Sequence, residues 1–146
     1  MTRRATPLVP WLMYLGGLPF VGLALGLALG LFGLEAQALM QEALQGYAFI
    51  IGAFMAGTHW GQRDSVTEAL RLFLLVSSNV LALALWAGLV LLAFKPALAL
   101  SGGVFLLLLA VDYRLLRAGA LEAGYFGHRV RITLVVLAGL ALALWA

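Results

Sequence analysis

The side chains that could do chemistry in this chain lie at the ends of long apolar runs. They are His59, Trp60, Asp112, Tyr113, His128 and Arg129. An imidazole, a carboxylate and a guanidinium can together form an ion cluster, bind a polar head group or handle a proton. A carboxylate next to hydrocarbon is costly alone and is usually paired. We therefore expect these residues to form one polar cluster in which Asp112 pairs with Arg129.

Two interpretations of this cluster stay open from the sequence. It could be a structural clamp that ties three apolar segments together, which is the commoner role for such residues. It could also bind a lipid head group, a quinone-like ligand or a proton. Haem ligation by His59 and His128 is geometrically allowed, but histidines at helix ends are more often simply hydrogen-bonded. We predict no cofactor and no metal.

A second polar feature interrupts the middle of an apolar run, at Ser78 and Asn79. A serine hydroxyl can bond to a carbonyl of its own helix, so Ser78 costs little there. An asparagine amide has more hydrogen-bonding groups to satisfy. We expect Asn79 to face other helices and to hydrogen-bond one of them.

The composition of the chain indicates which kind of secondary structure holds these residues in place. Of 146 residues, 64% are hydrophobic and 10% are charged, against roughly 25% charged in soluble domains. A chain this apolar is typical of a membrane protein. In lipid, open strands would leave backbone hydrogen-bonding groups unpaired, so the spans are expected to be helices. We predict a single all-α domain, residues 1–146, an integral membrane bundle of five transmembrane helices. The predicted spans are approximately 8–34, 43–61, 70–94, 96–114 and 127–146.

The basic residues predict an orientation for these five spans. Eight of the nine fall on one side of the membrane, and only Lys95 falls on the other. The eight are Arg3, Arg4, Arg63, Arg71, Arg114, Arg117, Arg129 and Arg131. Because cytoplasmic loops carry the excess of basic residues, we expect a cytoplasmic N-terminus, a C-terminus on the opposite side, and residence in the bacterial inner membrane.

Glycines mark a packing surface and a helix end. Gly22, Gly26 and Gly30 recur at four-residue spacing in the first span, which lets another backbone approach closely. We interpret them as a packing face, either within the bundle or toward a membrane-protein partner or a second copy. Gly119 follows Arg117 and predicts the end of the fourth helix.

Four short motifs, taken in order, are similar to those of a known family. They are Leu15-Gly16-x-x-Pro19-Phe20, Gly57-x-His59-Trp60-Gly61, Asp112 and Arg129-x-x-x-Thr133. In these the chain resembles the transmembrane protein 69-like family of small bacterial and mitochondrial membrane proteins. The resemblance implies a helical membrane fold and no established activity.

The function predicted from the sequence is non-enzymatic. Phosphate loops, paired carboxylates and nucleophile motifs are missing, and the connections between spans are short. We expect an accessory or assembly component that acts through helix–helix or lipid contacts. The alternative is a small-ligand or proton-handling protein that uses the polar cluster. Membrane lipids are the expected partners, and nucleic acid is not, because the basic residues form no continuous stripe.

Overall fold

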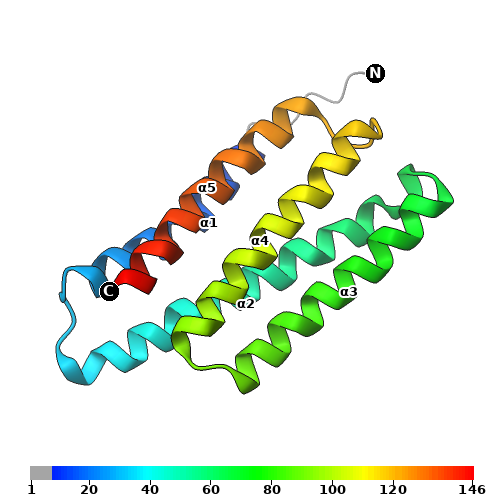
Figure 1. Cartoon of the computed structure of the whole chain (residues 1–146). Helices are drawn as coiled ribbons and strands as arrows, with labels where there is room; N and C mark the ends of the chain where they lie inside the picture. The colour runs from blue at the N-terminus through cyan, green and yellow to red at the C-terminus, as the bar shows by residue number, and fades with distance from the viewer. Residues whose placement is uncertain (1–7) are drawn as a thin grey trace.

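Residues 8–146 are described by the computed structural model, and they form five α-helices, one 3-10 turn at Arg63–Ser65 and no strand. The helices are α1 (Leu8–Ala28), α2 (Leu34–Gln62), α3 (Glu68–Leu91), α4 (Phe94–Arg117) and α5 (Ala123–Trp145) (Figure 1). The all-α prediction is confirmed for this part of the chain. Arg3 and Arg4, which the predicted orientation uses, lie outside the described residues.

Four of these helices, α1, α3, α4 and α5, are long and apolar enough to cross a membrane. Within the described residues α2 is the helix that falls short of this standard. Its 29 residues make it the longest helix, but glutamates at 35 and 42 and His59 lower its hydropathy. The chain therefore has the helices of a membrane protein, with α2 as its most polar member.

The first connection differs from the predicted spans. α1 ends at Ala28 and not near residue 34, because Gly30 adopts a left-handed conformation with φ of 61°. The Leu31 N–H donates to the Gly26 carbonyl at 3.0 Å, and the Gly30 N–H donates to Leu27 at 3.2 Å. These two bonds make a Schellman cap that stops the helix. α2 then begins at Leu34, well before the predicted start at 43.

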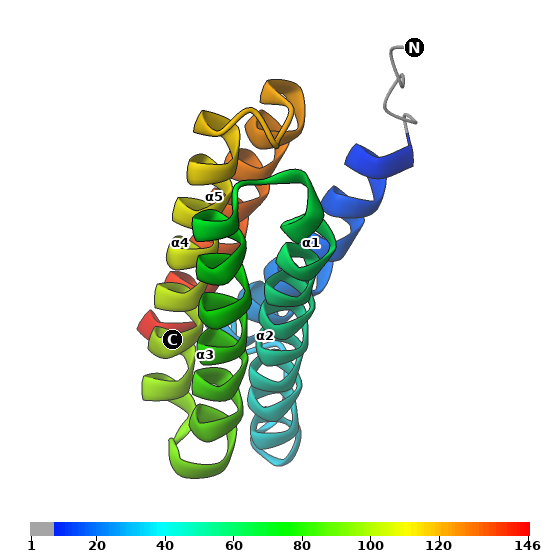
Figure 2. The ribbon, with the colours of Figure 1, turned by 90° about the vertical axis from the view of Figure 1, so that its right-hand side faces the viewer.

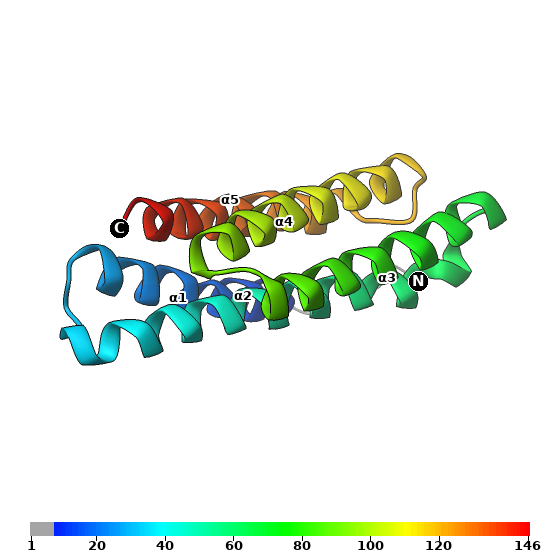
Figure 3. The same ribbon diagram turned by 60° about the horizontal axis from the view of Figure 1, so that its bottom comes forward.

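The helices form two layers. Figure 3 shows α4 and α5 lying over α1, α2 and α3. α5 contacts α1 and α4, and α2 contacts α1, α3 and α4. Because successive helices run in opposite directions, the α2–α3 and α4–α5 connections meet at the end of the bundle where α1 begins (Figures 1 and 2). The ends of α2 and α4 and the start of α5 therefore come together.

The core is apolar and closely packed where α1 crosses α5. Phe20 is fully buried, and its ring meets Tyr47 and Phe105 edge-on, at centroid distances of 5.0 and 5.8 Å. A Cβ built at Gly139 would lie 3.3 Å from the Phe20 carbonyl oxygen. Glycine thus allows the α5 backbone to approach the α1 backbone, as small residues do in membrane helices.

Candidate functional site

A buried ion cluster joins three helices at one end of the bundle. Asp112 in α4 accepts two hydrogen bonds, one on each carboxylate oxygen. The His59 Nε2–H of α2 donates to Oδ1 at 3.0 Å, and the Arg129 Nε–H of α5 donates to Oδ2 at 2.8 Å. The exposed fractions of His59, Asp112 and Arg129 are 1%, 3% and 4%. The predicted pairing of Asp112 with Arg129 is present, and His59 completes the cluster as predicted.

Local sequence explains why these three residues meet. His59 lies in the last turn of α2, Asp112 in the last two turns of α4, and Arg129 near the start of α5. Gly119, with φ of 73°, ends α4. The Ala120 N–H donates a hydrogen bond to the Leu115 carbonyl, and the Gly119 N–H donates one to the Leu116 carbonyl. This is the helix end that the sequence predicts. It turns the chain so that α5 returns along α4 with Arg129 beside Asp112.

The hydrogen bonds show which nitrogen of the His59 ring is engaged and which is not. Because Nε2 of His59 faces a carboxylate oxygen, that nitrogen carries a proton and is the donor. Nδ1 is buried and has no hydrogen-bond partner among residues 8–146. The carboxylate and the guanidinium cancel in charge. The buried cluster therefore contains a compensated ion pair, with the imidazole of His59 as its third member.

The guanidinium of Arg129 has a second contact, with a much weaker acceptor. Its Nη1 donates to the thioether Sδ of Met55 at 3.5 Å. Arginine has five N–H donors, and a thioether is a poor acceptor for them. Within the described part of the chain, the Nη side of Arg129 has no stronger partner. The free donors of the guanidinium lie next to Met55, on the side away from Asp112.

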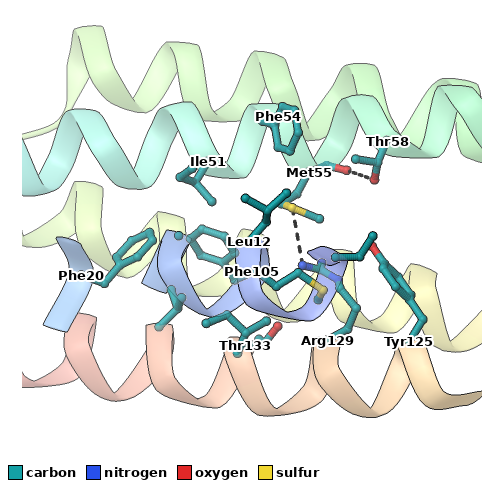
Figure 4. A pocket seen from close by; sticks show the side chains of 15 residues that line it. Leu12, Phe20, Ile51, Phe54, Met55, Thr58, Phe105, Tyr125, Arg129 and Thr133 are labelled. Atoms are coloured by element: carbon teal, nitrogen blue, oxygen red, sulfur yellow. Dashed lines mark hydrogen bonds between the residues drawn. The ribbon is translucent and has the colours of Figure 1, made fainter. Parts of the chain in front are cut away.

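That side of Arg129 lines a mostly apolar cavity of about 320 Å³ between α1, α2, α4 and α5. Figure 4 shows Arg129 and Met55 facing each other, with Phe20, Phe105 and Leu12 further along the cavity. Its polar lining residues are Thr58, Tyr125, Arg129 and Thr133. A cavity with many apolar walls and a few convergent polar groups is the usual form of a small-molecule site.

The mouth of the cavity lies between α1 and α2. Leu12 and Phe54, which line it, are exposed, whereas Phe105 and Val136 at its inner wall are buried. Figure 2 shows the first half of α1 inclining away from α2 on this side. A ligand would therefore enter sideways between the two helices.

Three other predicted cluster residues lie elsewhere. Trp60 and Tyr113 are exposed; Arg63 stacks over the Trp60 ring, and Tyr113 packs against Phe126. Nδ1 of His128 forms a hydrogen bond of 2.9 Å with the Tyr14 hydroxyl of α1. His128 therefore ties α5 to α1 and does not join Asp112. Among the described residues, no group of three His, Asp or Glu side chains could hold a metal ion.

Sequence reasoning misses the groups that shape the cavity. A lone methionine such as Met55 is normally interpreted as a packing residue. It lies one turn before His59, so the two side chains share one face of α2. Thr58 and Tyr125 carry no signal of their own. In the sequence Tyr125 is only an aromatic before the last span, and nothing there shows that it faces Arg129.

The prediction for Asn79 is wrong. The sequence predicts that it faces the bundle, but it is exposed, and its Nδ2 donates to the Leu75 carbonyl of its own helix at 2.7 Å. Ser78 is buried and bonds the same carbonyl at 3.1 Å, as expected for a serine in a helix. The face of α3 that packs against the bundle carries Ser78 together with Leu74, Leu81 and Leu85, and Asn79 lies off this face.

The glycine face of α1 is divided among three uses. A Cβ at Gly26 would collide with the ring of Phe32, because Phe32, in the connection between α1 and α2, packs directly against this glycine. Gly30 caps the helix. Gly22 lies exposed within the helix, and a Cβ added there would meet no atom of the described residues within 4 Å. Contact with a partner or a second copy through this face stays a prediction that rests on Gly22.

Comparison with known proteins gives a family and no activity. No curated protein and no solved structure matches the chain. A family model described as "Protein of unknown function (DUF3429)" matches residues 5–145. This description does not name the transmembrane protein 69-like family, so that resemblance stays a prediction. Because the match covers nearly the whole chain, the protein belongs to the DUF3429 family of proteins of unknown function.

Proposed function

We propose that this protein binds, within the membrane, an amphiphile with an apolar tail and a neutral, hydrogen-bond-accepting head, of which a quinone is the type. The observation that carries the proposal is the apolar cavity lined by the Nη donors of Arg129, where, among residues 8–146, only a thioether accepts. A ligand carbonyl would replace Met55 as the acceptor. The tail would lie along Phe20 and Phe105.

The charge of the cluster supports a neutral head over an anionic one. The Asp112 carboxylate lies 2.8 Å from Nε of Arg129 and cancels most of the field that a phosphate or carboxylate would need. A neutral carbonyl needs only directed N–H donors, which the guanidinium supplies. Thr133 and Tyr125 add further polar atoms to the lining of the cavity.

The proposal includes all five helices as membrane spans, with the N-terminus in the cytoplasm of a bacterial cell. α2 has 29 residues, which extend about 44 Å, more than the roughly 30 Å of a hydrocarbon core. Arg63, Arg71, Arg114 and Arg117 lie at the end of the bundle that holds the cluster. The positive-inside rule makes this end cytoplasmic. The mouth between α1 and α2 then opens toward lipid.

A pair of adjacent substitutions in α2 tests the binding proposal. Ile51 lines the cavity, whereas its neighbour Ile50 is exposed and does not. We expect Ile51→Trp to fill the cavity and to weaken binding of a decyl-chain benzoquinone at least about tenfold. Ile50→Trp should leave binding unchanged. Calorimetric titration of the protein in lipid nanodiscs measures both, with far-UV circular dichroism to confirm that each variant is folded.

Two further probes decide the class of head group. A saturated fatty acid and a phospholipid fluorescent analogue are titrated in the same way. Tighter binding of the fatty acid than of the benzoquinone would overturn the neutral head group. Absence of saturable binding for all three probes, or binding that Ile51→Trp leaves intact, would overturn the binding function.

The contact-based accessory role predicted from the sequence is a second proposal. The exposed Gly22 and the short connections between helices support it. Co-purification from mild detergent tests it, and a protein that is strictly monomeric and without a partner would contradict it.

A further inference from the structure

The most unusual polar group on the outside of the bundle is Asn79. It lies at the midpoint of α3, Glu68–Leu91, a helix long and apolar enough to span a bilayer. Its neighbours Val76, Val80 and Leu83 are exposed apolar side chains. In a membrane this places a carboxamide in the middle of the hydrocarbon layer, on a face that no other helix of the described chain covers.

The hydrogen bonds available to Asn79 leave it incomplete. A carboxamide has two N–H donors and an acceptor oxygen. One donor reaches the Leu75 carbonyl of the same helix. The second N–H and Oδ1 have no partner among residues 8–146. Lipid tails supply none, so the remaining groups favour a partner from another transmembrane helix.

The residues around Asn79 form a continuous seam on the outer face of α3. They alternate at spacings of four and three, as the core positions of a coiled coil do. The seam is Leu72, Val76, Asn79, Leu83, Trp86 and Val90. The opposite face of α3, with Leu74, Leu81 and Leu85, is buried against the bundle. The seam can therefore pack against another helix without disturbing the fold.

We propose that α3 is the interface of a parallel homodimer, in which Asn79 of one protomer hydrogen-bonds Asn79 of its partner. All copies insert with the same orientation, so the two-fold axis runs along the membrane normal. Such an axis brings each residue of α3 opposite itself at the same depth. A carboxamide is both donor and acceptor, so it is complementary to a second copy of itself. A central asparagine also fixes the register of the seam.

The proposed partner is a second copy of the chain, because its carboxamide lies at the same membrane depth and supplies both the donor and the acceptor that Asn79 lacks. A different partner would need its own polar group at the same depth. The glycine face of α1 is a poorer candidate, since Gly26 is filled by Phe32 and Gly30 ends the helix. The α3 dimer does not involve the cavity, so its test is independent of ligand binding.

Crosslinking tests where the two protomers meet. The chain contains no cysteine, so a single introduced cysteine reports one position. We expect Leu83→Cys, on the seam, to form a disulfide-linked dimer in liposomes under mild oxidation. Leu134→Cys, exposed on α5, is the matched control and should stay monomeric. Crosslinking at Gly22→Cys in place of Leu83→Cys would overturn the proposal in favour of the α1 face.

Substitution of the amide tests what drives the contact. Resonance energy transfer between labelled protomers, diluted stepwise with lipid, gives the dimerisation constant. We expect Asn79→Leu to weaken it at least about tenfold, equivalent to about 1.4 kcal/mol, and Asn79→Gln to retain most of it. Because Asn79, among residues 8–146, hydrogen-bonds only its own helix, Asn79→Leu should fold and melt like the parent. A dimer that survives Asn79→Leu within twofold would overturn the proposal.

Discussion

Replacing Asp112 by asparagine tests how strongly the buried cluster holds α2, α4 and α5 together. Asparagine has nearly the same shape, so no cavity is created. Its Oδ1 can still accept from Arg129, and the amide can donate to His59 once the imidazole shifts its proton to Nδ1. The geometry is therefore kept, and the main loss is the negative charge opposite the guanidinium of Arg129, a residue that is 4% exposed.

The magnitude follows from the contact geometry. Two unit charges about 4 Å apart interact by about 4 kcal/mol at an effective dielectric constant of about 20. Removing one partner of a buried pair costs about 3–5 kcal/mol, because the other charge is left uncompensated. We expect Asp112→Asn to lower the free energy of unfolding by about this amount.

Steric trapping in bicelles, which reports reversible unfolding of membrane proteins, measures the change. Asp64→Asn is the control: Asp64 pairs with Arg63 at 3.6 Å, but its side chain is 70% exposed. A surface pair contributes at most about 1 kcal/mol, so this variant should stay close to the parent. If Asp112→Asn cost no more than Asp64→Asn, the cluster would not be a clamp.

A paired replacement separates the charge from the packing. Asp112→Leu combined with Arg129→Met removes both charges and fills similar space, which is often neutral for a buried pair. We expect the double variant to be less destabilised than the sum of its single variants by about 2 kcal/mol or more, with the remaining cost due to the unpaired Nε2 of His59. Additive costs would contradict a direct interaction.

Two further predictions concern glycines. Gly139→Leu should lower the free energy of unfolding by about 1–3 kcal/mol, because the new side chain would push against the Phe20 carbonyl oxygen. The control is Gly103→Leu, which should leave stability close to the parent, since a Cβ at Gly103 meets no described atom within 4 Å. The same unfolding assay compares the two variants. Gly119→Ala should lower the free energy of unfolding by about 1 kcal/mol, because φ at this position is 73°. The control, Gly57→Ala in helical backbone, should be neutral or stabilising. Equal effects at both positions would contradict the role of the left-handed cap.

The helices and the ion cluster could be predicted from the sequence for one physical reason. Charged groups in an apolar chain have few favourable places, so Asp112 needed a partner, and the short last span drew Arg129 toward the same edge of the apolar layer. Spacing of the apolar runs then placed His59 at the same end. These conclusions needed the topology alone and no knowledge of which helices are neighbours.

The cavity and the outer faces could not be predicted, because apolar helices look alike around their circumference. In a water-soluble bundle the polar face identifies the exposed side. In α1 and α3 nearly every position is apolar, so the sequence does not distinguish the side that meets lipid from the side that meets protein. Met55 and Leu12 could equally have been core or surface, and the Tyr14–His128 bond depends on how α1 tilts.

Asp112, near one end of the bundle, and Asn79, at the midpoint of α3, are both polar residues in apolar helices, yet the fold buries the first and exposes the second. Translocon-based scales put a charge at about 2.5–3.5 kcal/mol at the membrane centre, the upper limit for a carboxylate elsewhere in the apolar layer, whereas an interhelical hydrogen bond of a neutral side chain is worth about 0.6–2 kcal/mol. The protomer therefore arranges three helices around the carboxylate. It leaves the amide outside, satisfied in part by Leu75. A polar group that folding leaves exposed in lipid is still costly enough to favour association, and this difference in cost is why the contact of Asn79 is expected between protomers and not within one.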